Sequence, residues 1–175
     1  MLGATVQTSN TRILAEISVT VALSVILNMI KVYALPQGGS ITLGSMIPIL
    51  LLAYRRGVGV GVYAGIVFGL VQMVIEGYIY YPLQIILDYP LAFGSLGLAG
   101  LFKKHPIIGT IVALTGRFLS HFISGLVFFA EYAPKEMGPI LYSAVYNGSY
   151  IIPEAVISSI VIYILMKRNL LNLNL

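Results

Sequence analysis

The sequence predicts an all-α integral membrane protein with six transmembrane helices. Of its 175 residues, 58% are hydrophobic and only 9% are charged, whereas about a quarter of the residues in a soluble domain are charged. Most of the apolar segments reach the roughly 20 residues that a helix needs to cross a bilayer. The chain contains no cysteine, which excludes disulfides, thiolate metal sites and cysteine nucleophiles.

Turn and charge signals separate the predicted spans. The breaks lie at LPQGGS, YRRG, EGYIYYP, KKHP and EYAPKEMGP, and each contains the glycine, proline or charged residues that end a span. The predicted spans are residues 12–33, 41–54, 57–76, 83–102, 107–130 and 139–166. No linker or second domain is indicated, so residues 1–175 are expected to form a single six-helix membrane domain.

The second and third spans have distinctive compositions. The second span is short, and its Pro48 predicts a kinked or tilted helix packed against others. The third span begins with the glycine-rich run GVGVGVYAGIVFG. Small residues allow close helix packing in lipid, whereas a phosphate-binding loop would need a strand before it and a lysine after it. We therefore interpret these glycines as packing residues.

The basic residues are distributed unevenly between the two sides of a six-span topology. Seven of the ten lysines and arginines fall on one side, namely Arg12, Arg55, Arg56, Lys103, Lys104, Lys167 and Arg168. Two fall on the other side, namely Lys31 and Lys135. Cytoplasmic loops carry such an excess, so both termini are predicted to be cytoplasmic. The net charge of +4 then reflects membrane topology and does not indicate nucleic-acid binding.

Polar residues from three spans lie at one depth, in the outer half of the membrane. They are Asp88, His121, Tyr142 and Asn147, and Arg117 lies one helical turn deeper. A charged side chain at the centre of a bilayer costs about 2.5–3.5 kcal/mol, so such residues usually face a cavity or a partner. This distribution predicts a binding pocket that opens outward.

The roles of individual polar residues remain open at this stage. Asp88 is suited to bind a cation or a pair of N–H donors, or else it forms an ion pair or stabilises a helix start. Tyr89 is a pocket wall or an interfacial aromatic. His121 contacts a ligand or bonds a backbone carbonyl. Arg117 binds the ligand, or it forms a structural ion pair with Glu154, which lies at equal depth.

Enzyme signatures are missing from the sequence. There is no HExxH metal motif, no G-x-S-x-G nucleophile elbow and no Walker A motif. We therefore expect a protein that is not an enzyme, has no cofactor or metal, and relies on a partner for energy. Two alternatives remain: a small intramembrane enzyme that uses His121 and Asp88 as acid and base, and a scaffold subunit without a ligand.

The chain resembles a known family over nearly its whole length, and four runs carry the local part of this resemblance. They are IPILLLAYRRG, PLQIILDYPLAFGSLGLAGLF, GRFLSHFISGLVFFAEYAPK and LYSAVYNGSYIIPEA. The chain resembles the thiamine-specific substrate-binding (S) component of an energy-coupling factor (ECF) vitamin transporter, the ThiT or YuaJ family. The matching motifs are Asp88-Tyr89-Pro90, Arg117 with His121, Tyr142 with Asn147, and Tyr78 ten residues before Asp88.

The resemblance implies a function, partners and a location. Such an S component binds thiamine from outside the cell and docks on a membrane T component with two ATPase subunits, in the plasma membrane of a prokaryote. The implied ligand-binding residues are Tyr78, Asp88, Tyr89, Arg117, His121, Phe129, Tyr142, Tyr146 and Asn147. The implied docking residues on the first span are Ala15, Ser18 and Ala22, an incomplete match to the family's Ala-x-x-x-Ala face.

The chain also departs from the family pattern. The family has glutamate at the position of Asp88 and lysine at the position of Arg117, and it stacks thiamine on tryptophans that this chain lacks. Phe129 and Tyr33 are the expected substitutes. These departures leave open an S component for another vitamin or precursor, such as a pyrimidine, biotin or riboflavin. The loop LPQGGSIT has the glycines to close over a ligand as a lid.

The chemistry of thiamine assigns provisional roles within this pocket. The N–H edge of the aminopyrimidine suits Asp88, and the flat cationic thiazolium suits the rings of Tyr89 and His121. The hydroxyethyl arm needs hydrogen-bond partners. The candidates for this arm are Arg117, Tyr142 and Asn147.

Overall fold

The computed structural model describes residues 2–168, with side chains from Asn10 onward. Helices make up most of this part of the chain. The α-helices are α1 (Leu2–Met29), α2 (Ile47–Arg56), α3 (Val58–Glu76), α4 (Pro82–Ile86), α5 (Ala92–Gly94), α6 (Pro106–Phe128) and α7 (Pro139–Lys167). A π-helix η1 (Leu87–Leu91) joins α4 to α5, and 3₁₀-helices η2 (Ser95–Phe102) and η3 (Ala130–Tyr132) follow α5 and α6. The strands are β1 (Lys31–Ala34) and β2 (Ser40–Thr42).

Five helical stretches are long and apolar enough to cross a membrane, by length and composition. They are Asn10–Met29, Val58–Glu76, Pro82–Phe102, Pro106–Phe128 and Pro139–Lys167. The third joins α4, η1, α5 and η2, and we call it the 82–102 rod. Each stretch coincides with a predicted span to within a few residues, because hydropathy and flanking turns determine where an apolar helix begins and ends. The protein is an all-α membrane protein apart from the short β1–β2 hairpin.

The predicted second span is shorter than expected. Its first residues form a strand and a turn, and α2 covers only Ile47–Arg56, about half of what a bilayer requires. The predicted kink at Pro48 is wrong, because Pro48 lies in the first turn of α2, where no helical N–H bond is lost. Ile49, Leu50 and Ala53 have no exposed surface, so α2 is enclosed by the other helices.

The predicted first span is too long at its C-terminal end. α1 ends at Met29, and β1 pairs with β2 in antiparallel register, with Tyr33 opposite Ile41. The turn between the strands is closed by the Leu35 N–H, which donates to the Gly39 carbonyl at 2.7 Å. Gly38 adopts a φ of 86° there, a conformation that glycine takes without steric cost.

The glycines of α3 bring it close to the 82–102 rod, as the sequence predicted. A Cβ added at Gly65 would lie 2.8 Å from the carbonyl carbon of Phe93, and one at Gly69 would lie 2.7 Å from that of Tyr89. Only residues without a side chain allow two backbones to approach this closely. The rod also packs against α6, which packs on its other side against α7.

The π-helix η1 contains Asp88, Tyr89 and Pro90. Pro90 has no N–H to continue the α-helical ladder, and the backbone widens by one residue at this point. The Leu87 carbonyl accepts a hydrogen bond from the Ser120 hydroxyl of α6 at 2.7 Å, which ties the widened turn to its neighbour. Single π-turns of this kind occur frequently at functional sites.

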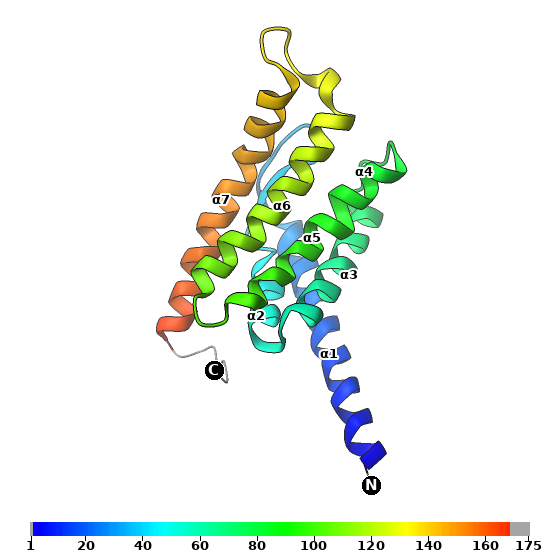
Figure 1. Cartoon of the computed structure of the whole chain (residues 1–175), viewed down its shortest axis with the longest axis vertical. Helices are drawn as coiled ribbons and strands as arrows, with labels where there is room; N and C mark the ends of the chain where they lie inside the picture. Colours follow the sequence, from blue (N-terminus) through cyan, green and yellow to red (C-terminus); the bar gives the residue numbers. More distant parts are fainter. Residues whose placement is uncertain (1, 169–175) are drawn as a thin grey trace.

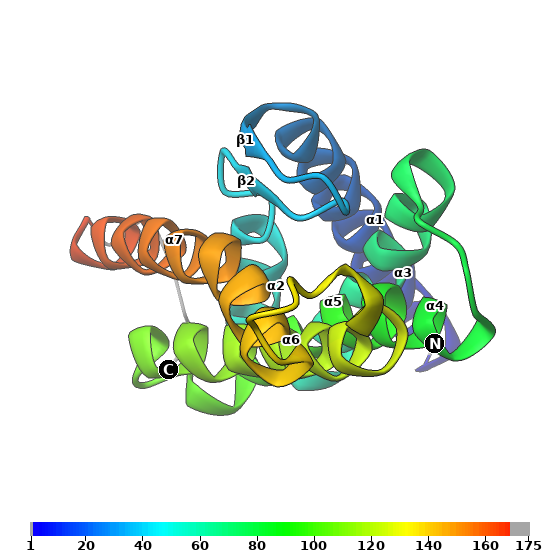
Figure 2. The same ribbon diagram turned by 90° about the horizontal axis from the view of Figure 1, so that it is seen from above.

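The start of α1 and the end of α7 lie at the same end of the molecule (Figure 1). The connection between α6 and α7 lies at the opposite end. Viewed from that end, the β1–β2 hairpin lies between α1 and α7 (Figure 2).

Candidate ligand-binding site

One cavity below the hairpin brings together polar and aromatic side chains from α1, α3, the 82–102 rod, α6 and α7. All nine residues that the sequence nominated for ligand binding line it. They are Tyr78, Asp88, Tyr89, Arg117, His121, Phe129, Tyr142, Tyr146 and Asn147. They come from the loop after α3, from η1, from α6 with its C-terminal end, and from α7. The shared cavity is a finding, whereas binding of a ligand by these residues stays a prediction.

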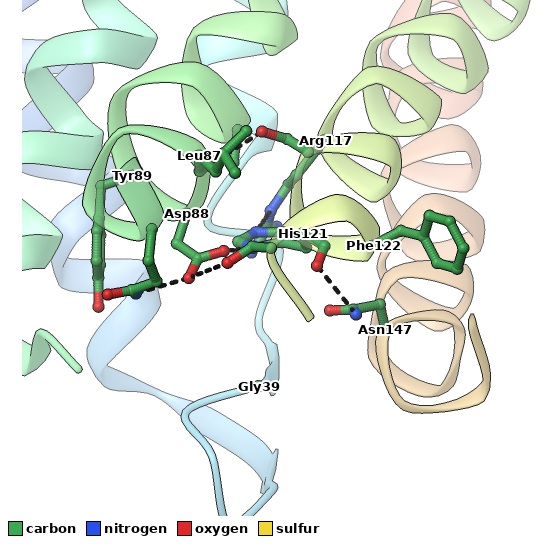
Figure 3. Close-up of polar contacts among 12 residues, drawn as sticks. Gly39, Leu87, Asp88, Tyr89, Arg117, His121, Phe122 and Asn147 are labelled. Atoms are coloured by element: carbon green, nitrogen blue, oxygen red, sulfur yellow. Dashed lines mark hydrogen bonds and ion pairs between the residues drawn. The ribbon is translucent and has the colours of Figure 1, made fainter. Parts of the chain in front are cut away.

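The Asp88 carboxylate is held by three hydrogen-bond donors (Figure 3). Its Oδ2 accepts from Gln84 Nε2 at 2.7 Å and from Ser124 Oγ at 2.8 Å. Its Oδ1 lies 3.1 Å from His121 Nδ1. An ionised carboxylate offers about four acceptor sites, so one remains for a donor that enters the cavity. Asp88 is thus positioned by the protein and still able to bind.

The hydrogen bonds of His121 determine its tautomer. Arg117 Nε donates to His121 Nε2 at 3.3 Å, and an arginine has no acceptor. Nε2 is therefore unprotonated, and Nδ1 carries the proton that it donates to Asp88. His121 is a neutral imidazole that links a guanidinium to a carboxylate, and the backbone-bonded alternative for its ring is not what the structure shows.

Arg117 is buried at the inner end of the cavity, with 9% of its surface exposed. Its guanidinium lies over the Phe93 ring at 4.6 Å and at 6.0 Å from the Tyr150 ring centre, within the range of cation–π attraction. Its Nη1 also contacts the sulfur of Met46. Arg117 forms no ion pair with any of the described side chains.

The alternative ion pair between Arg117 and Glu154 is therefore not formed. Glu154 is 1% exposed, and its Oε1 accepts hydrogen bonds from the backbone N–H and the hydroxyl of Thr42 at 2.5 and 2.7 Å. Its Oε2 has no hydrogen-bond partner within the described part of the chain. The side chain of Glu154 turns to the end of β2 instead.

A ladder of tyrosines on α7 forms one wall of the cavity. Tyr142, Tyr146 and Tyr150 are spaced four residues apart, with successive ring centres 5.9 Å apart. The Tyr150 ring lies 6.1 Å from that of His121, and its hydroxyl donates to Asn147 Oδ1 at 2.7 Å. The Asn147 amide N–H groups bond to the backbone of α6 and α7. Asn147 is thus fixed in orientation by both helices.

The hairpin loop touches the tyrosine ladder through backbone groups. We call residues 35–42 the lid. The Gly39 N–H donates to the Tyr146 hydroxyl at 3.1 Å, and a Cβ on Gly39 would lie 2.7 Å from the Tyr150 ring. On the opposite rim, the Tyr78 hydroxyl donates to the Pro36 carbonyl at 3.0 Å. The lid therefore rests on tyrosines from both sides of the cavity.

One predicted substitute for the family's tryptophans is wrong. Tyr33 lies on β1, is 59% exposed and is not among the residues that line the cavity, because the hairpin directs this strand outward. Phe129 does line the cavity, and its ring meets that of Tyr80 edge-to-face at 5.8 Å. The additional aromatic surface comes from Tyr150 and Phe93, which line the cavity.

The sequence interpretation missed several cavity residues. They include Asn28, Gln72, Gln84, Phe93, Ser124 and Tyr150. Gln84 and Tyr150 had a usable signal, because each lies four residues from a nominated residue on the same helix face, Asp88 and Tyr146. Phe93 had the same signal, because it lies four residues after Tyr89, and both line the cavity.

The fold and the cavity together define a multi-pass helical membrane protein that holds a small polar, aromatic-walled site between its helices. A family model described as thiamine transporter protein (Thia_YuaJ) matches residues 14–173. The chain belongs to this thiamine transporter family.

Three relatives agree with the assignment. A protein named thiamine transporter ThiT from Bacillus subtilis (strain 168) is 36% identical over 171 residues, which cover 87% of this chain and 88% of the relative. A protein of the same name from Lacticaseibacillus paracasei is 33% identical over 141 residues, which cover 69% and 70%. A solved structure of ThiT from Listeria monocytogenes has a TM-score of 0.83 at 29% identity, over 91% of this chain and 96% of that one.

Proposed function

We propose that this protein is the thiamine-binding S component of an ECF-type importer in the plasma membrane of a prokaryote. It captures thiamine from outside and delivers it through a shared energising module of a T component and two ATPases. Membership of the thiamine transporter family supports this proposal. The observation that carries it is the Asp88 carboxylate, which three donors orient within an aromatic-walled cavity.

The cavity has the chemistry that thiamine requires. The aminopyrimidine presents an N–H edge, which pairs with the remaining acceptor capacity of Asp88 as a charge-assisted hydrogen bond. The thiazolium is a permanent flat cation, which favours the faces of Tyr89, Tyr146 and Phe129. Tyrosine and phenylalanine attract a cation less strongly than tryptophan does, so the ladder on α7 supplies several rings in place of one indole.

The hydroxyethyl arm of thiamine falls to the polar groups at the inner end and along α7. Arg117 has no carboxylate in contact among the described residues, so its N–H groups remain able to donate to an oxygen of the ligand. Tyr142 and Asn147 line the same cavity. A guanidinium beside a cationic ligand is unfavourable unless the two are separated. We therefore place the hydroxyl, and not the thiazolium, nearest Arg117.

The lid closes the outer side of the cavity in this proposal. Its backbone carries the contacts to the rim tyrosines, and the apolar side chains of Leu35 and Ile41 at its two ends pack against the hydrophobic core. Its inner end is anchored by the hydrogen bonds between Thr42 and Glu154. Opening would then be a hinge motion of residues 36–40 about a fixed base, with release of ligand limited by the lid.

The topology in this proposal has six spans in one domain, with both termini in the cytoplasm. α2 counts as the sixth span together with the hairpin that precedes it. Three of the arginines predicted to be cytoplasmic surround Glu16 of α1, and they are Arg12, Arg55 and Arg56. One carboxylate among three guanidiniums leaves a positive excess at that end, in agreement with the positive-inside rule.

The docking face for the T component is proposed to be the outer face of α1. Ala15, Ser18 and Ala22 are exposed and, at spacings of three and four, share one helix face. We expect Ala22→Trp to abolish co-purification with the T component and ATPases while thiamine binding is retained. Ile160→Trp on α7, which is also exposed, is the control and should co-purify normally. Equal co-purification of both variants would contradict this face.

The binding proposal is tested by titration calorimetry of the purified protein in detergent. We expect nanomolar binding of thiamine and no binding of riboflavin or biotin. Asp88→Ala and Asn147→Ala are expected to weaken thiamine binding at least tenfold, by the loss of one hydrogen bond to the ligand or of its orientation. If both variants bind thiamine as well as the parent protein does, the ligand site lies elsewhere.

A further inference from the structure

Gln84 connects the candidate ligand-binding carboxylate to the rim of the cavity. It lies on α4 one turn before Asp88 and has no exposed surface. Its Nε2 donates both to Asp88 Oδ2 at 2.7 Å and to the Tyr78 carbonyl at 2.9 Å. Its Oε1 accepts from the Tyr80 N–H at 3.2 Å. A buried amide is costly unless its groups are paired, and here both ends of the Gln84 amide are paired.

The three bonds fix the plane of the Gln84 amide. Its oxygen faces the loop after α3, one N–H faces that same loop, and the other N–H faces Asp88. Rotation of the amide to follow a displaced Asp88 would break the bonds to Tyr78 and Tyr80. The position of the Asp88 carboxylate is therefore tied to the position of the loop at residues 78–80.

Tyr78 continues this connection to the lid. Its backbone N–H donates to the Tyr89 hydroxyl at 2.8 Å, and its own hydroxyl donates to the Pro36 carbonyl at 3.0 Å. Its ring also lies under Gly38, where an added Cβ would come within 2.9 Å of it. Displacement of Tyr78 removes both the hydrogen bond and the surface on which the lid rests.

We propose that Gln84 is a positioning residue that couples the Asp88 carboxylate to closure of the lid through Tyr78. This inference rests on the proposed function, because it assigns the coupling to the thiamine site. Engagement of Asp88 by the ligand holds Gln84 and the 78–80 loop in the arrangement that meets Pro36. By reciprocity, a closed lid holds Asp88 in the orientation that binds.

The test uses thiol modification of a cysteine at the lid. The chain has no cysteine of its own, so Gln37→Cys, in the lid and facing the cavity, reports lid opening through its rate of reaction with a maleimide. We compare this reporter alone with reporter proteins that also carry Gln84→Met, Tyr78→Phe or both. Gln84→Met keeps the shape and removes all three hydrogen bonds, whereas Tyr78→Phe removes the bond to Pro36.

In the absence of ligand, each substitution should raise the reaction rate about threefold to tenfold, the effect of losing one hydrogen bond. The double variant should react no faster than the faster single variant, because both act on one connection. Gln72→Met is the matched control, since Gln72 lines the cavity and bonds to Asn28 of α1. Its effect should add to that of Tyr78→Phe.

Saturating thiamine should slow modification of the reporter at least tenfold, and Gln84→Met should abolish most of this protection even at saturation. A purely structural role for Gln84 would lower the affinity for thiamine but leave protection at saturation unchanged.

If Gln84→Met does not raise the reaction rate in the absence of ligand, the coupling is refuted, whatever thiamine does. If thiamine neither binds nor protects the parent reporter, the proposed function fails, while the ligand-free comparison still decides the coupling. Gln84→Glu, which keeps the acceptor oxygen, replaces Gln84→Met if that variant does not fold.

Discussion

Replacement of Asp88 by asparagine tests the site most directly, because the donors around it leave the amide no suitable orientation. If the new NH₂ group takes the place of Oδ2, it faces the N–H of Gln84 Nε2. If it takes the place of Oδ1, it faces the N–H of His121 Nδ1. His121 can avoid this conflict only by moving its proton to Nε2, which then faces the N–H of Arg117.

The magnitude follows from these contacts. Each buried donor left facing another donor costs about 1–3 kcal/mol, and a hydrogen bond to a charged group contributes about 1.5–3 kcal/mol. Because the conflict between donors exists with and without ligand, it lowers the stability of the fold, whereas the lost hydrogen bond to a charged group should weaken thiamine binding by about 1.5–3 kcal/mol, roughly tenfold to a hundredfold. The unliganded protein should also unfold at a lower temperature.

Calorimetric titration with thiamine and thermal unfolding in detergent measure the two effects. Glu131→Gln is the matched control, because it makes the same isosteric charge loss at an exposed residue outside the cavity, and it should leave both quantities unchanged. Asp88→Glu should retain binding within about tenfold, because it keeps the charge. Its extra methylene shifts the carboxylate relative to its three donors but places no donor against another donor. An Asp88→Asn affinity within threefold of the parent would refute this account.

Three further predictions concern the packing and the inner end of the cavity. Gly65→Ala should lower the melting temperature, because its Cβ would lie 2.8 Å from a backbone carbon of the 82–102 rod and overpacking costs about 1–3 kcal/mol. Gly59→Ala on the same helix meets nothing within 4 Å and should stabilise the fold by up to about 1 kcal/mol. A higher melting temperature for Gly65→Ala than for Gly59→Ala would contradict the close-packing interpretation. Thr42→Val should destabilise the fold by about 1–2 kcal/mol, because it removes a donor to Glu154. Thermal unfolding measures this effect, and an unchanged melting temperature would show that this hydrogen bond does not anchor the base of the lid. Arg117→Met should weaken thiamine binding about tenfold, whereas Arg117→Lys keeps a donor and the charge and should weaken binding less. Equal affinities of the two variants in calorimetry would exclude a ligand contact by Arg117.

The secondary structure shows which features of the fold the sequence could predict. The apolar runs and their flanking turns predicted the spans of α3, the 82–102 rod, α6 and α7 to within a few residues, because bilayer thickness sets a length that hydropathy reports. Pro48 was misread, since a proline in a first turn and a proline in mid-helix look alike until the helix start is known. The hairpin was missed for a related reason: its strands are short, and their pairing is a contact between segments.

The site divides in the same way. The motifs of the family resemblance nominated nine residues, and all nine lie around one cavity. Depth along α6 and α7 placed Arg117 level with Glu154, yet the Glu154 side chain bonds to Thr42. Depth is a property of one helix, whereas rotation about the helix axis determines which side chains meet.

The sequence by itself determined the membrane class, the approximate spans, the family resemblance and nine of the residues that line the cavity, because each follows from local composition or from motifs along the chain. The tertiary structure decided that donors from α4 and α6 hold Asp88 and that His121 carries its proton on Nδ1. It also decided that Arg117 has no carboxylate partner among the described residues. It placed the lid on Tyr78 and Tyr146. These features are contacts between segments far apart in the chain. They depend on how helices are rotated and packed against one another, which a single helix does not encode.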